Sequence, residues 1–237
     1  PAADLDPDVF LDYPSPRPLA GVDDDGVRVV EWPSIDLYAA HLPGGADALL
    51  LVASEPHLKW RTFCEQVVGI AHETGARLVL TLGALVAEVP HSRPVPVVGT
   101  ATDAALQAEL GLPASTYEGP TGIVGVLSDA CRVAGLPSAS LWAAVPTYVP
   151  TAPSPKAQLA LIERAGEVLG TWVPTTDLEI AAASYERQVS ELVEEDDETS
   201  DYVSRLETRH DESGGDDETA GKSLVAEVER YLRRRQD

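Results

Sequence analysis

The sequence predicts an α/β fold, a mostly parallel sheet covered by helices on both faces, followed by a helical acidic C-terminal extension. Three observations lead to this prediction. Continuous apolar runs at residues 48–53, 77–82 and 138–145 are typical of strands buried on both faces of a parallel sheet. Segments with helical periodicity alternate with these runs. From residue 177 onward the chain becomes helical and charged. We therefore expect a core domain at residues 1–176 and an extension at residues 177–237.

The elements are predicted from local signals, in chain order. Residues 1–25 are expected to be irregular, because their prolines remove backbone donors and restrict the preceding residues. Each expected core helix ends at a glycine, the residue that most easily adopts the left-handed conformation that closes a helix. The expected strands are 27–32, 37–41, 48–53, 77–82, 95–99 and 138–145, and the expected helices are 60–74, 103–110, 122–134, 156–169, 177–193, 201–209 and 223–235, with an acidic linker at 210–221.

Charge and composition exclude several function classes. Seventeen Lys and Arg against 39 Asp and Glu give a formal net charge of -22, which repels nucleic-acid backbones and anionic lipid surfaces. The sequence contains no apolar run of the roughly 20 residues that span a bilayer, and the charged, proline-rich segment 1–18 lacks the apolar stretch of a signal peptide. We therefore expect a cytoplasmic protein. Cys64 and Cys131 lie among apolar residues of expected helices and are interpreted as small buried side chains.

A candidate ligand site is predicted where open α/β sheets usually bind ligands, just after the carboxyl ends of strands and at helix starts. The segment 117–131 carries a Gly-Pro turn that leads into an apolar helix, whose first backbone N–H groups suit an anion. Segments 55–61, 83–93 and 146–148 follow the three interior strands. The candidate residues are His57, Arg61, His91, Arg93, Glu118, Thr121, Gly122 and Tyr148.

Each candidate also has a purely structural interpretation. Glu118 could pair with Arg61 or Arg93, Thr121 could cap its helix, and His57 and His91 could bridge backbone groups beside prolines. No complete phosphate loop, zinc spacing or Gly-x-Ser-x-Gly elbow accompanies them. The sequence therefore predicts no metal and no cofactor, and it names no catalytic residue.

Five segments resemble the proteasome assembly chaperone family, in its uncharacterised actinobacterial branch. They are EPHLKWRTF at 55–63, LTLGALVAEVPHSRPVPV at 80–97, YEGPTGIVGVL at 117–127, SLWAAVPTYV at 140–149 and PKAQLALI at 155–162. The resemblance implies a three-layer α/β/α sandwich similar to purine nucleoside phosphorylases, relatives that act by protein contact, and an N-terminal strand and helix before Leu11. Archaeal members use a C-terminal hydrophobic-Tyr-any-residue tail, whereas this sequence ends Arg235-Gln236-Asp237.

Two functions remain open from the sequence. The favoured one is a non-enzymatic interaction or assembly protein, whose apolar C-terminal helices and acidic surface engage a protein partner or further copies of the chain. The alternative is a nucleoside- or phosphate-binding protein or enzyme, in which Arg93 and the helix start at Gly122 hold an anion while Glu118 orients a sugar or base. The helix at 223–235, with its apolar stripe, is expected to dock in an apolar groove.

Overall fold

The computed structural model describes residues 5–43, 45 and 47–212. Contacts divide these residues into two compact units. Unit 1 comprises residues 5–79 and 121–138, and unit 2 comprises residues 80–120 and 139–212. The expected boundary at residue 176 stays a prediction. The expected helix at 223–235 and most of the acidic linker before it lie outside the described residues.

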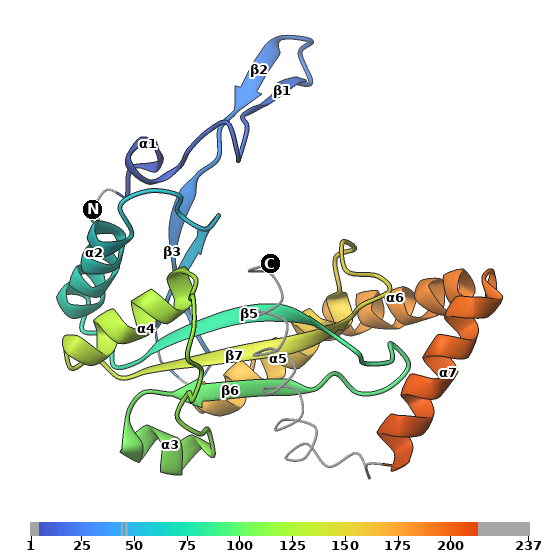
Figure 1. Ribbon diagram of the computed structural model, residues 1–237. Coiled ribbons are helices and arrows are strands. Elements are labelled where there is room, and N and C mark those ends of the chain that lie inside the picture. Colours follow the sequence, from blue (N-terminus) through green and yellow to red (C-terminus); the bar gives the residue numbers. More distant parts are fainter. Residues whose placement is uncertain (1–4, 44, 46, 213–237) are drawn as a thin grey trace. The chain divides into compact units, whose positions relative to one another are not determined.

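Unit 1 combines short antiparallel strand pairs with helices (Figure 1). The N-terminal segment is more regular than its prolines predict, since it contains a short helix and a strand. The helix is capped by Asp6, whose Oδ1 accepts from the Asp8 N–H at 2.9 Å. The elements are α1 (Pro7–Phe10), β1 (Leu19–Val22), β2 (Arg28–Glu31), β3 (Ile35–His41), β4 (Asp47–Ala53), α2 (Trp60–Glu73) and α4 (Ile123–Val133).

The strand β4 differs from its prediction in both partner and burial. It pairs antiparallel with β3, from Ile35 opposite Ala53 to His41 opposite Asp47, in a sheet of two strands. Its apolar run was expected to be buried on both faces of a parallel sheet. Leu51 packs on the core of unit 1, whereas Leu50 on the other face is 50% exposed. The apolar run predicts the strand correctly but not its neighbours.

The core of unit 1 lies between α1, α2 and α4. Phe10 and Phe63 meet edge to face, with ring centroids 5.3 Å apart, and both are buried. Cys64 and Cys131 are buried in the same cluster as free thiols, which confirms their interpretation as small core side chains. Burial raises the pKa of Cys131 to about 11, so this thiol is protonated near neutral pH.

Unit 2 is built on a three-stranded sheet with the order β5-β7-β6 (Figure 1). Helix α3 contacts β6, and α5 packs against α6, which contacts α7. The helix α7 extends through residues 210–212, which were predicted to begin a linker. The elements are β5 (Val79–Ala87), β6 (Val97–Ala101), α3 (Ala104–Leu110), β7 (Ser138–Pro146), α5 (Pro155–Leu169), α6 (Thr176–Glu194) and α7 (Asp197–Glu212).

The sheet of unit 2 is mixed, not mostly parallel as predicted. Strand β7 runs parallel to β5, because contacts advance along both strands together: Thr81 Oγ1 lies 2.7 Å from Ser140 Oγ, and the Thr147 N–H donates to the Ala87 carbonyl at 3.1 Å. On its other edge β7 pairs antiparallel with β6. Most of β7 is buried, as predicted, and Leu141 is fully buried. The central strand thus brings the loop after it beside the loop after β5.

Candidate functional site

Two of the predicted site residues meet at the carboxyl ends of β5 and β7. The loop after β5 carries His91, and the loop after β7 carries Tyr148. The Tyr148 hydroxyl accepts from the His91 backbone N–H at 2.7 Å and lies 2.8 Å from the Nδ1 atom of the His91 ring. The parallel pairing of the two strands explains this contact, since their carboxyl ends lie at the same edge of the sheet.

Hydrogen-bond geometry assigns one tautomer to His91. Ser190 Oγ donates its proton to the Glu186 carbonyl at 2.9 Å, so it accepts from His91 Nε2, which lies 2.9 Å away. In the neutral ring Nδ1 then carries no proton and accepts from the Tyr148 hydroxyl, which also accepts from the His91 backbone N–H. Each donor in this series of hydrogen bonds has an acceptor.

Burial keeps His91 uncharged. Its side chain is 5% exposed, and desolvation lowers its pKa below the ordinary value, against the opposing attraction of Glu186 and Glu207. Desolvation also raises the pKa of Tyr148 to about 12. Neither group is therefore poised to exchange a proton near neutral pH. The pair instead fixes the position of two loops.

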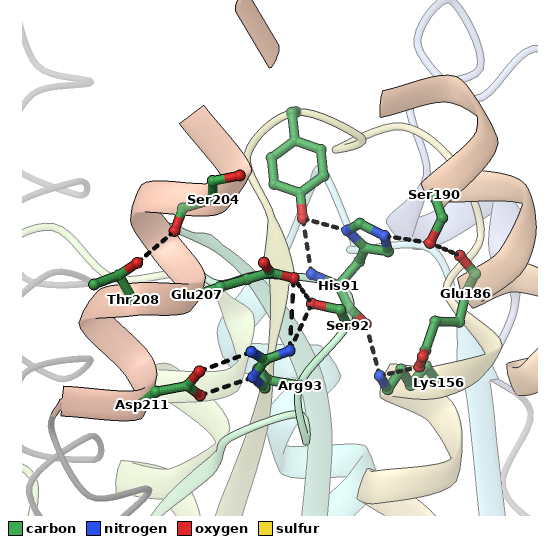
Figure 2. A network of polar contacts seen from close by, with 11 residues as sticks. His91, Ser92, Arg93, Lys156, Glu186, Ser190, Ser204, Glu207, Thr208 and Asp211 are labelled. Carbon is green, nitrogen blue, oxygen red and sulfur yellow. Dashed lines mark hydrogen bonds and ion pairs between the residues drawn. The ribbon is translucent and has the colours of Figure 1, made fainter. Parts of the chain in front are cut away.

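Lys156 connects the same loop to two helices. It lies in the first turn of α5, its Nζ donates to the His91 carbonyl at 2.6 Å, and it forms an ion pair with Glu186 on α6 (Figure 2). The ammonium group is mostly buried, so this charge depends on its two oxygen partners. The loop after β5 is thus held by β7, α5 and α6 together.

Arg93 is bound by carboxylates of α7. Its Nε donates to Asp211 Oδ1 at 2.8 Å and its Nη2 to Asp211 Oδ2 at 2.7 Å, a bidentate pair (Figure 2). Glu207 lies 3.6 Å from Nη1 and also accepts from Ser92. The guanidinium holds the pKa of Asp211 below its ordinary value. Arg93, expected to bind an anionic ligand, is engaged by the protein itself.

A small cavity lies beside this network. It is lined by residues that include His91, Lys156 and Tyr185, and its volume is about 10 Å³, the room of about one water molecule. The Tyr185 hydroxyl is buried and has no protein partner. The cavity suits a water molecule and is far too small for a nucleoside.

Two candidates of unit 1, Thr121 and Gly122, lie at a helix start that a carboxylate already occupies. Gly122 is the N-cap of α4 and supplies no side chain, and Glu55 Oε1 instead accepts from the Ile123 N–H at 2.8 Å. Thr121, proposed as the cap, does not cap this helix. The carboxylate of Glu55 therefore occupies the helix end at which an anionic ligand was predicted.

The other candidates of unit 1 have separate positions. His57 Nδ1 accepts from the Asp12 N–H at 3.5 Å, in line with the structural role considered for it beside prolines. Arg61 is exposed in the first turn of α2.

Glu118 belongs to unit 2 and is exposed in the turn before α4. In that turn the Tyr117 hydroxyl donates to the Pro120 carbonyl at 2.8 Å. A Cβ atom at Gly119 would lie 2.6 Å from the Tyr117 hydroxyl, and its φ of 155° is rare for other residues. The backbone angle and this close approach both favour glycine at position 119.

Sequence reasoning missed most of the residues that complete the network. One local signal was available: Glu186 and Ser190 are four residues apart, so they lie on the same face of α6. Glu207 was predicted in a helix and Asp211 in the acidic linker of the C-terminal extension, and only the tertiary contacts show what they bind. The missed residues are Glu55, Ser92, Lys156, Glu186, Ser190, Glu207 and Asp211.

Residues 5–43, 45 and 47–212 contain no group of three or more His, Cys, Asp or Glu side chains placed to hold a metal ion. Within the same residues, no helix is both long enough and apolar enough to cross a membrane. The Figure 2 network offers mutually satisfied donors and acceptors and no free nucleophile beside a base. Its geometry is that of a structural tie between loops and helices.

Fold and site together define a mixed α/β protein whose strand-end polar groups are bound to one another. The chain belongs to the PAC2 family, whose model matches residues 1–193. This confirms the family resemblance found in the sequence. No functionally curated protein matches the chain.

Solved structures agree with this assignment. A PAC2 family protein from Streptomyces avermitilis is 41% identical, with a TM-score of 0.76 and coverage of 84% of each chain. A proteasome-assembly chaperone homologue from Mycobacterium tuberculosis is 42% identical, with a TM-score of 0.72, covering 82% of this chain and 83% of its own. A Corynebacterium glutamicum protein of unknown function is 25% identical, with a TM-score of 0.79 and coverage of 90% and 79%.

Proposed function

We propose that the chain is a cytoplasmic, non-enzymatic interaction module of the assembly-chaperone kind, and that its partner is a proteasome subunit. Family membership and the 42% identity to a proteasome-assembly chaperone homologue support the choice of partner. One observation carries the preference for binding over catalysis. The polar groups that a small ligand would need are already bound by the protein, as Arg93 is by Asp211 and the start of α4 is by Glu55.

The surface proposed for this partner lies at the junction of α5 and α6. This junction exposes several large apolar side chains, and Trp172 is 66% exposed. Exposed aromatic side chains of this kind often dominate the binding energy of protein interfaces. Asp177 and Glu179 lie in the first turn of α6, so the apolar surface has an acidic border. The neighbouring apolar residues are Leu169, Val173 and Ile180.

This chemistry specifies the partner surface. An apolar site on the partner excludes water from the Trp172 side chain, and a border of Lys and Arg around that site complements the acidic residues of α6. The formal net charge of -22 steers the chain toward such a basic surface. A proteasome subunit that binds here should therefore present an apolar patch bordered by Lys and Arg.

The test measures binding of the full chain to purified α-type and β-type proteasome subunits of the same organism. Trp172→Ala should weaken the complex by about thirtyfold, the equivalent of about 2 kcal/mol for a central aromatic side chain. Leu58→Ala removes an exposed leucine of unit 1 and serves as the matched control, with unchanged affinity. If the unsubstituted chain binds neither subunit type, the proposal fails.

A second measurement addresses the small-molecule alternative. Thermal unfolding is followed with inorganic phosphate, nucleosides and nucleotides, since a ligand at a hundred times its Kd adds about 2.7 kcal/mol of stability. We expect no shift. A raised melting temperature that Arg93→Gln abolishes would favour a ligand-binding function instead.

A further inference from the structure

The β1–β2 ribbon of unit 1, residues 19–31, is exposed along its whole length. All eight residues of the two strands are exposed, among them Leu19, Val22 and Val30. The strands form a sheet of their own, with register Leu19 opposite Glu31. A two-stranded ribbon that packs on nothing is marginally stable in water. The described residues therefore leave this element in need of a partner.

Local contacts nevertheless give the ribbon one defined shape. At its tip, Asp23 Oδ1 accepts from the Asp25 N–H at 3.1 Å and from the Val27 N–H at 2.8 Å. At its base, the rings of Tyr13 and Trp32 meet edge to face with centroids 5.1 Å apart. The ribbon is thus organised before any partner binds, which lowers the cost of association.

Hydrogen bonding in the ribbon determines which backbone groups face outward. The Asp23 N–H donates to the Val27 carbonyl at 2.9 Å, so this pair is hydrogen-bonded. Hydrogen-bonded and non-bonded pairs alternate along an antiparallel ladder. Counting along the register, Val29 and Glu31 direct their backbone groups to β1, while Arg28 and Val30 direct theirs to the open edge. No strand among the described residues pairs with the outer edge of β2, so this edge can accept another strand.

We propose that β2 pairs edge to edge, antiparallel, with β2 of a second copy of the chain. Two identical antiparallel strands are related by a two-fold axis perpendicular to the sheet, so residues that face each other lie on the same face. A register centred on Val30 places this residue opposite its own copy. It also places Arg28 opposite Trp32 of the second copy, where a guanidinium can lie over an indole ring. The pairing converts two ribbons into one four-stranded sheet.

Charge placement supports a second copy as the occupant, despite the formal net charge of -22. The acidic tip, residues 23–25, lies at one end of the ribbon. In the antiparallel arrangement the two tips point in opposite directions, so their repulsion is at its smallest. The paired strands themselves carry one cation, Arg28, and one anion, Glu31. This inference does not rest on the proteasome partner proposed above, which uses a surface of unit 2.

The test measures the mass of the full chain by light scattering and sedimentation over a wide range of concentration. The unsubstituted chain should form assemblies that are multiples of two copies, each of 25.2 kDa. Val30→Lys places two like charges opposite each other and should halve the mass. Val30 is 49% exposed, so the substitution leaves the fold intact, which circular dichroism checks. Val133→Lys, at an exposed valine of α4, is the matched control and should leave the mass unchanged.

A mixing experiment tests the self-opposed register directly. Val30→Glu should also halve the mass when measured alone. Mixed with Val30→Lys, it should restore the larger mass, because Lys then lies opposite Glu across the two-fold axis. The proposal is overturned if the unsubstituted chain keeps the mass of one copy, if Val30→Lys leaves the mass unchanged, or if the mixture fails to associate. None of these results depends on whether a proteasome subunit binds.

Discussion

Strands β7 and β4 have similar apolar sequences but lie in different surroundings. Both are apolar runs, and both were predicted to be buried in a sheet. Strand β7 has a neighbour on each edge and is largely buried, whereas β4 pairs with β3 alone among the described residues and is largely exposed. The comparison teaches that an apolar run predicts a strand from its own residues, while burial depends on partners that the run does not contain.

The loops after the two strands differ in the same way. Tyr148 lies two residues after β7 and joins a buried network with His91. Glu55 lies two residues after β4 and caps an exposed helix start. Both residues tie distant segments together, but only Tyr148 does so through a buried side chain, that of His91. This difference makes measurable predictions.

The largest expected effect compares the two strands directly. Leu141→Ala on β7 removes a fully buried side chain and should lower the free energy of unfolding by about 2 to 5 kcal/mol. Leu50→Ala on β4 removes a half-exposed one and should cost about 1 kcal/mol or less. Denaturant unfolding of both variants gives the two values. Equal losses would show that β4 is as well covered as β7.

An intermediate effect is expected from the loops. Tyr148→Phe leaves two groups of His91 without partners, the backbone N–H and Nδ1, and should cost about 1 to 3 kcal/mol. Glu55→Ala removes the cap of α4 and should cost about 0.5 to 2 kcal/mol, near the low end because the site is exposed. Tyr38→Phe, at an exposed tyrosine, is the control for loss of a hydroxyl and should be silent. A smaller loss for Tyr148→Phe than for Glu55→Ala would contradict the comparison.

The smallest expected effect is a pH dependence of the loop after β5. Since the folded protein lowers the pKa of His91, the unfolded chain binds more protons between that pKa and about 6.5. Stability should therefore fall as pH drops below about 6.5. The groups that face the ring include Lys156, Glu186 and Glu207, and the two carboxylates favour the charged form and limit the effect.

The measurement compares urea midpoints of the unsubstituted chain and His91→Gln across this pH range. The carboxylates titrate equally in both proteins, so the difference between the two pH profiles isolates the contribution of His91. Parallel pH profiles would mean that His91 is no less basic in the folded state than in the unfolded chain.

Part of the site could be predicted from the sequence, because the ends of strands can be predicted from it. Placing His91 and Tyr148 after two strands of a parallel pair was sufficient to expect them near each other, and they are in contact. The residues of α6 and α7 that complete the site could not be predicted in this way. Asp211 lies 118 residues from Arg93 along the chain, and an acidic helix carries no local mark of which cation it binds.

By itself the sequence determined the features that depend on neighbouring residues. The four helices α2 to α5 end where glycine follows, as at Gly111 and Gly170 with φ of 66° and 62°, because the left-handed cap is a property of one residue. The buried thiols and the central strand β7 were likewise predicted from their apolar surroundings. Only the tertiary structure decided that β4 pairs with β3, that Glu55 caps α4 and that α7 binds Arg93. These depend on segments distant in the chain, whose approach is fixed by the packing of whole elements and not by any local pattern.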